Sequence, residues 1–146
     1  MKRNSKLSLA LHALGHMGLE PDRRFTSEEL AVQNATNAVV VRRVLGLLRQ
    51  AGLISSETGR TGGWALTRSA EKITVADVYR AVGSTLVPRD GDGPDNPTGC
   101  QIEVALHGVV DLAMQDAERA LTARLEQVTI GDLSRGLNLC SGEGVG

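Results

Sequence analysis

The stretch "FTSEELAVQNATNAVVVRRVLGLLRQAG", residues 25–52, carries the signals for two short helices joined by a tight turn. Thr26 stands three residues before Glu29, which is the spacing of a capping box, and Phe25 supplies a hydrophobic residue in front of the cap. These signals predict a helix that starts after Thr26 and ends near Gln33.

After the turn "NAT", Asn37 is a suitable cap for a second helix, which Gly52 ends. Helical spacing predicts a buried stripe of Val41, Val44, Leu45 and Leu48. The same spacing places four residues near the outer face: Val39, Val40, Arg42 and Arg43. A short helix, a tight turn and a second helix with exposed arginines near its start are what a helix-turn-helix requires.

The flanking segments extend this pattern on both sides. Leucines at helical spacing predict a first helix from about Ser5 to Met17. Beyond Gly52, "LISSE" and "GWALT" are typical of two short strands, and Thr74 with Asp77 caps a fourth helix, "VADVYRAVG". Three helices, a hairpin and a helix form the order of a winged helix-turn-helix, so the predicted fold is mainly α with a small β-hairpin wing.

The glycines of Gly59–Gly63, "GRTGG", raise the alternative of a phosphate-binding loop in an enzyme. The context does not match, because no Lys-Ser/Thr follows and the glycines lie between two strands instead of between a strand and a helix. A hairpin turn that needs positive φ angles explains them better. An arginine at such a tip, Arg60, suits insertion into a minor groove, so we expect a DNA-binding protein and no enzyme.

Charge is distributed unevenly along the chain. Residues 1–80 carry 12 Lys or Arg against 7 Asp or Glu, and residues 81–146 carry 4 against 10. The first part is therefore suited to a polyanion. The single Trp, Tyr and Phe argue against a binder of single strands that stacks bases on aromatic rings.

Beyond the polar segment Pro88–Gly99, "CQIEVALHGVVDLAMQDAERALTARLEQ" predicts a helix of about 25 residues. Its apolar residues form two stripes, so more than one side needs to be covered. One small domain covers only one side, and a second subunit is the expected partner. The stripes consist of Ile102, Leu106, Val109 and Ala113, and of Val110, Met114, Ala117 and Leu121.

The start of the chain is interrupted by histidines and is amphipathic, so we interpret it as an internal helix and not as a secretory signal. No apolar run is long enough to span a bilayer. Two widely separated cysteines, Cys100 and Cys140, do not make a disulfide framework, and the cytoplasm is the expected location.

Other residues offer a rival function. His12 and His16 stand at i and i+4, a spacing that can hold a metal, and Cys100 opens a helix, where the helix dipole favours the thiolate. The alternative is therefore a small metal- or thiol-dependent protein that uses these three residues. The more ordinary interpretations are packing or surface histidines and a cysteine buried as a small hydrophobe.

Taken together, "LALHALGHM", "FTSEELA", "VRRVLGLLRQAGLISS", "GRTGGWALTR" and "ITVADVYRAVG" resemble the Rrf2 family of bacterial transcription regulators. The resemblance covers nearly the whole chain and implies a homodimer that binds a palindromic operator in double-stranded DNA, as a repressor or an activator. It implies a winged helix-turn-helix over residues 1–83, a loop over 84–99, a dimerisation helix with a short terminal helix over 100–135, and a flexible tail over 136–146. The DNA contacts that it implies are Ser27, Asn37, Val39, Val40, Arg42 and Arg43, with Arg60 and Thr61 in the wing.

Two departures from the family pattern bear on function. Many members carry an arginine before the first wing glycine, where this chain has Thr58, with Arg60 after Gly59. Iron–sulfur members hold their cluster with three cysteines in the loop, and this loop offers only Cys100 at its end. We therefore expect no three-cysteine cluster. Redox sensing through the Cys100 thiol is favoured over an unusual cluster shared with His12.

Overall fold

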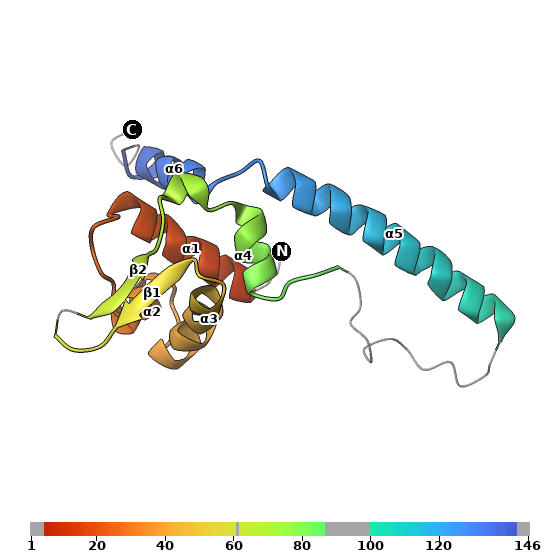
Figure 1. Ribbon diagram of the computed structural model, residues 1–146, viewed down its shortest axis with the longest axis horizontal. Helices are drawn as coiled ribbons and strands as arrows, with labels where there is room; N and C mark the ends of the chain where they lie inside the picture. The colour runs from red at the N-terminus through yellow and green to blue at the C-terminus, as the bar shows by residue number, and fades with distance from the viewer. Residues whose placement is uncertain (1–4, 61, 87–99, 143–146) are drawn as a thin grey trace.

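The computed structural model describes residues 5–60, 62–86 and 100–142. A group of helices surrounds a small hairpin, and one long helix extends away from this group (Figure 1). In chain order the elements are α1 (Ser5–Leu19), α2 (Ser27–Gln33), α3 (Ala38–Gln50), β1 (Ile54–Glu57), β2 (Gly63–Leu66), η1 (Ala70–Lys72), α4 (Val75–Ala81), α5 (Gln101–Leu125) and α6 (Ile130–Gly142).

Local signals build the helix-turn-helix as the sequence predicts. The Glu29 amide donates to Thr26 Oγ1 and the Thr26 amide donates to Glu29 Oε2, each at 3.0 Å, which completes the capping box of α2. Asn37 Oδ1 accepts from the Val40 amide at 3.1 Å and so caps α3. In the turn between the helices, Ala35 takes a left-handed conformation with φ of 52°, which is uncommon for a residue with a side chain.

The predicted inner stripe of α3 lies in the core. Val41, Leu45 and Leu48 are fully buried and Val44 is 2% exposed. They pack with α1, whose Leu14 is also fully buried, and together with Phe25, Met17 and Leu30 these residues form one hydrophobic core under the helix-turn-helix.

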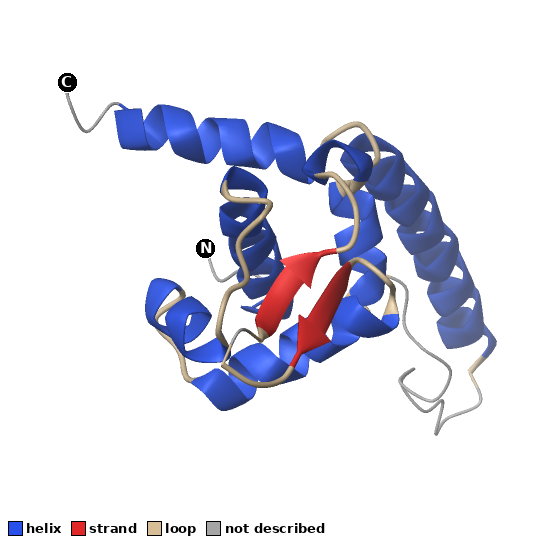
Figure 2. Cartoon of the chain, turned by 60° about the vertical axis from the view of Figure 1, so that its left-hand side comes forward, coloured by secondary structure: helices blue, strands red, loops and turns tan. Residues whose placement is uncertain are grey.

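The wing is a two-stranded antiparallel hairpin in which Ile54 pairs with Leu66 and Glu57 with Gly63 (Figure 2). Trp64 also exchanges two backbone hydrogen bonds with Phe25, at 2.8 and 2.9 Å, which ties the hairpin to the segment before α2. Gly63 has φ of 130°, and a Cβ there would lie 2.7 Å from the Phe25 carbonyl oxygen. A glycine is therefore required at this position for both reasons.

The long helix α5 has 25 residues, none of them buried. It is attached to the other helices near its C-terminal end, where Glu126 Oε1 accepts from Arg80 of α4 at 2.5 Å. Figure 1 shows its N-terminal part extending away from them. None of the helices among the described residues is both long and apolar enough to cross a membrane.

The last helix changes the domain boundaries that the sequence suggested. α6 packs back along α1, where Ser134 Oγ donates to the Gly15 carbonyl at 2.8 Å and Ile130 is fully buried. The body therefore consists of α1–α4, the wing and α6, and α5 is an arm inserted between α4 and α6. The helix also continues to Gly142, so the tail predicted from 136 would start inside it.

Candidate nucleic-acid interface

The outer face of α3 is exposed and basic. Val39 is 59% exposed, and Arg42 and Arg43 are also exposed, whereas the residues on the inner side of the same helix are buried. A helix that is held by the core on one side presents its other side rigidly, as major-groove recognition requires.

The two arginines differ in their electrostatic environment. Arg42 Nη1 lies 3.5 Å from Glu28 Oε1 of α2, with both side chains more than half exposed. Arg43 has no carboxylate oxygen within 4.0 Å among the described residues. Glu28 was not expected to take part in this surface, because only the folding of the turn brings α2 and α3 together. No sequence signal would have identified it.

Two residues expected on the contact surface take part in the fold as well. Asn37 is exposed, but its side-chain oxygen is used in the cap of α3, which leaves the amide group for an outside partner. Val40 does not lie on the outer face as expected: it is half-buried and packs against the core. It stands one position before buried Val41, and the apolar side of α3 is wide enough to include it.

Ser27 is corrected more strongly. Its side chain is 8% exposed, and its Oγ accepts the indole Nε1–H of Trp64 at 2.9 Å. The hydroxyl therefore joins α2 to the wing and does not face solvent. Ser27 is the first residue of α2, where an outward position was expected, but the hairpin crosses in front of it.

The wing tip carries Arg60, which is exposed, while Thr61 lies outside the described residues. At the base of the wing Arg24 Nη2 pairs with Glu57 Oε1 at 3.0 Å, and Arg24 Nη1 donates to the Gly63 carbonyl at 3.5 Å. These contacts hold the hairpin against the segment before α2. Arg60 thus stands at the end of a fixed support, and Arg24 is occupied in building that support.

These features match a known family of regulators. The model of the Rrf2 family, described as an iron-dependent transcriptional regulator, matches residues 3–136. The chain belongs to the Rrf2 family. Among curated Rrf2-type proteins, the putative HTH-type transcriptional regulator YwnA of Bacillus subtilis is 31% identical over 133 residues, which cover 89% of this chain and 95% of YwnA. Protein rrf2 of Nitratidesulfovibrio vulgaris is 29% identical over 113 residues, covering 77% and 73%.

A solved structure supports the fold of this Rrf2 protein. A putative transcriptional regulator from Lactobacillus plantarum superposes with a TM-score of 0.75 at 24% identity, covering 91% of this chain and 89% of the other. The winged helix-turn-helix fold predicted from the sequence is confirmed, and the protein is a DNA-binding transcription regulator.

The iron named in the family description can be compared with the donor atoms of this Rrf2 chain. The chain has two cysteines, Cys100 and Cys140, so one chain cannot supply three thiolates to a cluster. Cys100 is exposed in front of α5. Among the residues that the structure describes, no three His, Cys, Asp or Glu side chains are grouped as metal ligands. The residues do not fit a three-cysteine cluster.

The two histidines of α1 lie together but apart from Cys100. His16 Nε2 lies 3.1 Å from His12 Nε2, and His12 Nδ1 lies 2.7 Å from Asn34 Oδ1. Asn34 donates from Nδ2 to the Leu30 carbonyl, so its oxygen faces His12 and accepts from Nδ1. Within one chain Cys100 stands before the projecting start of α5, away from α1 (Figure 1). The three residues of the rival hypothesis therefore do not converge in one chain.

Proposed function

We propose that this Rrf2 protein binds a palindromic operator as a homodimer, with α3 in the major groove and the wing at the adjacent minor groove. The observation that carries the proposal is the rigidly supported outer face of α3 with Arg42 and Arg43. Repression follows from occupation of a promoter, which needs no further domain.

Base reading is assigned to the outer face of α3. Val39 supplies an apolar surface suited to a thymine methyl, and Arg43 supplies a guanidinium that suits the O6 and N7 atoms of guanine. Arg42 is partly neutralised by Glu28 and is placed closer to phosphate. Asn37 contributes its amide group, and Arg60 reaches the minor groove, where negative potential is concentrated.

The homodimer is supported by the surface of α5. Seven large apolar side chains in the first half of this helix are exposed: Ile102, Val104, Leu106, Val109, Val110, Leu112 and Met114. An apolar surface of this extent on a regulator marks a site of protein association. A second copy of the same helix offers a matching apolar surface with the same two carboxylates, Glu103 and Asp111.

Two-fold symmetry of such a dimer predicts the form of the operator. Two copies of α3 related by a two-fold axis contact half-sites that are inverted repeats. Their centres are expected to be one helical turn of DNA, about 34 Å, or a multiple of it apart. An arm of 25 residues, about 37 Å as a helix, is long enough to hold the two bodies at this spacing.

The experiment is an anisotropy titration of the full chain against genomic fragments at several salt concentrations, with sedimentation analysis of the free protein. We expect dimers and binding that weakens as salt rises, because counterions are released from the phosphates. Arg43→Ala should weaken binding to the preferred fragment by about 1–3 kcal/mol and reduce discrimination at one base pair. Binding to no fragment at any salt concentration would overturn the proposal.

A second proposal concerns the signal: Cys100 is the redox-responsive thiol. It is exposed, and the backbone N–H groups of Glu103 and Ile102 hold the pKa of the thiol below its ordinary value. A lower pKa increases the thiolate fraction, and the thiolate is the nucleophile. With a disulfide as oxidant, the Cys100 sulfur forms a new S–S bond and the second thiol leaves as thiolate.

This second proposal is tested with glutathione disulfide and mass spectrometry of the intact protein, followed by operator titration. We expect one added glutathione at Cys100, a changed operator affinity, and loss of both effects in Cys100→Ser. Cys140→Ser is the matched control and should keep both. Modification that leaves the operator affinity unchanged would contradict a sensing role.

A further inference from the structure

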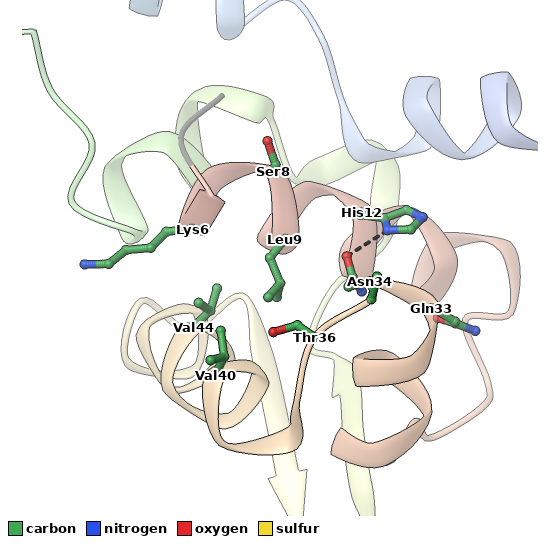
Figure 3. Close-up of a pocket in the computed structure, with 10 residues that line it drawn as sticks. Lys6, Ser8, Leu9, His12, Gln33, Asn34, Thr36, Val40 and Val44 are labelled. Carbon is green, nitrogen blue, oxygen red and sulfur yellow. Dashed lines mark hydrogen bonds between the residues drawn. The ribbon is translucent and has the colours of Figure 1, made fainter. Parts of the chain in front are cut away.

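A pocket of about 660 Å³ lies between α1 and the turn of the helix-turn-helix (Figure 3). This volume is within the range of sites that take small metabolites, roughly 300–1,000 Å³. Its lining comes from α1, from the end of α2 with the turn, and from the first half of α3: Lys6, Ser8, Leu9, His12, Gln33, Asn34, Ala35, Thr36, Val40 and Val44.

The centre of the pocket is apolar. Leu9 is 8% exposed and Val44 is 2% exposed, and Val40 stands beside them. Figure 3 shows the Thr36 hydroxyl directed into the space between Leu9 and Val40. An aliphatic group with a polar atom attached therefore matches this surface better than a fully polar ligand does.

The charged group at the pocket is positive. Lys6 is the one formally charged residue among the lining residues, none of which is Asp or Glu. Its ammonium extends away from the apolar centre, at the end opposite His12 (Figure 3). A long and exposed lysine stem can bring the ammonium to a ligand at the mouth. The charge pattern favours an anion whose head group lies at this end.

The other end of the pocket is closed by a hydrogen-bonded wall. His12 Nδ1 lies 2.7 Å from Asn34 Oδ1, and His12 Nε2 lies 3.1 Å from His16 Nε2. Both ring nitrogens of His12 are thus engaged with protein atoms. The His12 ring acts as a wall that links α1 to the end of α2, and it does not compete for the head group of a ligand.

From these observations we propose that this pocket binds a small aliphatic monocarboxylate. The carboxylate lies at the Lys6 end and accepts from the Thr36 hydroxyl, and the alkyl chain covers Leu9, Val40 and Val44. Because the same pocket is bounded by the turn before α3, with Ala35 at φ of 52°, occupation also changes the affinity for the operator. This regulatory consequence rests on the proposed function, whereas ligand binding itself does not.

The experiment is isothermal titration of the full-length protein with acetate, butanoate, hexanoate and octanoate, and with hexylamine and hexanamide as probes of charge. We expect affinity to rise with chain length up to the size of the pocket, and no binding of hexylamine. Lys6→Gln should weaken hexanoate binding roughly fivefold, as expected for an exposed ion pair of about 1 kcal/mol. Lys6→Arg should retain it. Lys72→Gln removes the same charge from η1, outside the pocket, and should change nothing.

Several results would overturn the site. These are no heat from any carboxylate, equal binding of hexanoate and hexylamine, and equal losses in Lys6→Gln and Lys72→Gln. Operator titrations with and without hexanoate separate the two proposals. Carboxylate binding without any DNA binding contradicts the proposed function but supports the site. DNA binding without carboxylate binding contradicts only the site, and an operator affinity that saturating hexanoate leaves unchanged overturns the regulatory consequence.

Discussion

The indole Nε1–H of Trp64 donates to Ser27 Oγ at 2.9 Å, in a buried contact between the wing and the first residue of α2. This contact fixes the position of the hairpin relative to the helix-turn-helix. Ser27→Ala leaves the indole N–H buried without its acceptor and should destabilise the protein by about 1–3 kcal/mol. Urea unfolding followed by circular dichroism measures this, with Ser55→Ala on strand β1 as the control. Equal stabilities of the two variants would contradict the role of this hydrogen bond.

The pairing of Glu28 with Arg42 leads to a prediction for DNA affinity. Glu28→Gln removes a negative charge beside the recognition helix and releases the arginine, so binding to DNA should tighten about two- to fivefold, the range of an exposed ion pair. Anisotropy titrations at low salt measure the change. Glu20→Gln removes the same charge from a pair with Arg23, away from α3, and is the control. A weaker complex for Glu28→Gln would indicate that Glu28 itself contacts a base.

The apolar face of α5 predicts which substitutions prevent association. Val109 is 66% exposed in one chain, and Val109→Glu would place a charge in the proposed dimer interface. The dimer dissociation constant should rise at least about tenfold. Gln115→Glu adds the same charge on the side of α5 that carries Asp111, and should leave the dimer intact. Sedimentation velocity at several concentrations distinguishes these outcomes, and a Val109→Glu protein that remains dimeric would place the interface elsewhere.

The His12 and His16 pair predicts a dependence of stability on pH. Burial, and then the neighbouring His12, lower the pKa of His16, while Glu20 opposes the shift. The unfolded state therefore binds the proton more strongly than the folded state does. The contribution is fully present above the unfolded pKa of about 6.5 and is lost as pH falls through the folded value. The urea midpoint should decrease from about pH 7.5 to about pH 5.5, and less so in His16→Gln. His107→Gln, on α5, should keep the full decrease.

Ile130 tests whether α6 is part of the body. It is fully buried although it follows the arm in sequence, so Ile130→Ala should destabilise the body by about 2–4 kcal/mol. Ile102→Ala makes the same change at a side chain that is 79% exposed on α5. Because the chain has a single tryptophan at the base of the wing, its fluorescence reports the unfolding of the body in both variants. Equal and small losses in both would contradict the packing of α6.

The sequence predicted most of the elements because their signals are local. The capping boxes at Thr26 and Thr74 are complete in sequence, and both form as predicted. The stripe of α3 follows from helical spacing alone, and its buried members are those that were expected. The hairpin followed from its glycines, two of which have positive φ angles.

The parts that could not be predicted depend on contacts between distant segments. The burial of Ser27 requires Trp64, which lies 37 residues away, and the bond from Ser134 to Gly15 spans 119 residues. Helical periodicity assigns a residue to the inner or outer side of its own helix. It does not indicate which other element crosses that side, and this is why Ser27 and Val40 were placed outward.

The insertion of α5 between α4 and α6 has a consequence for synthesis of the protein. Ile130 and Ser134 complete the packing against α1, and they leave the ribosome only after the whole arm has been made. The apolar face of α5 is thus exposed while the body still lacks its last helix. Nascent chains that meet through their arms at this stage would assemble before their DNA-binding surfaces are finished. Co-translational pairing of neighbouring chains on one messenger is therefore a route to the dimer that this chain order permits.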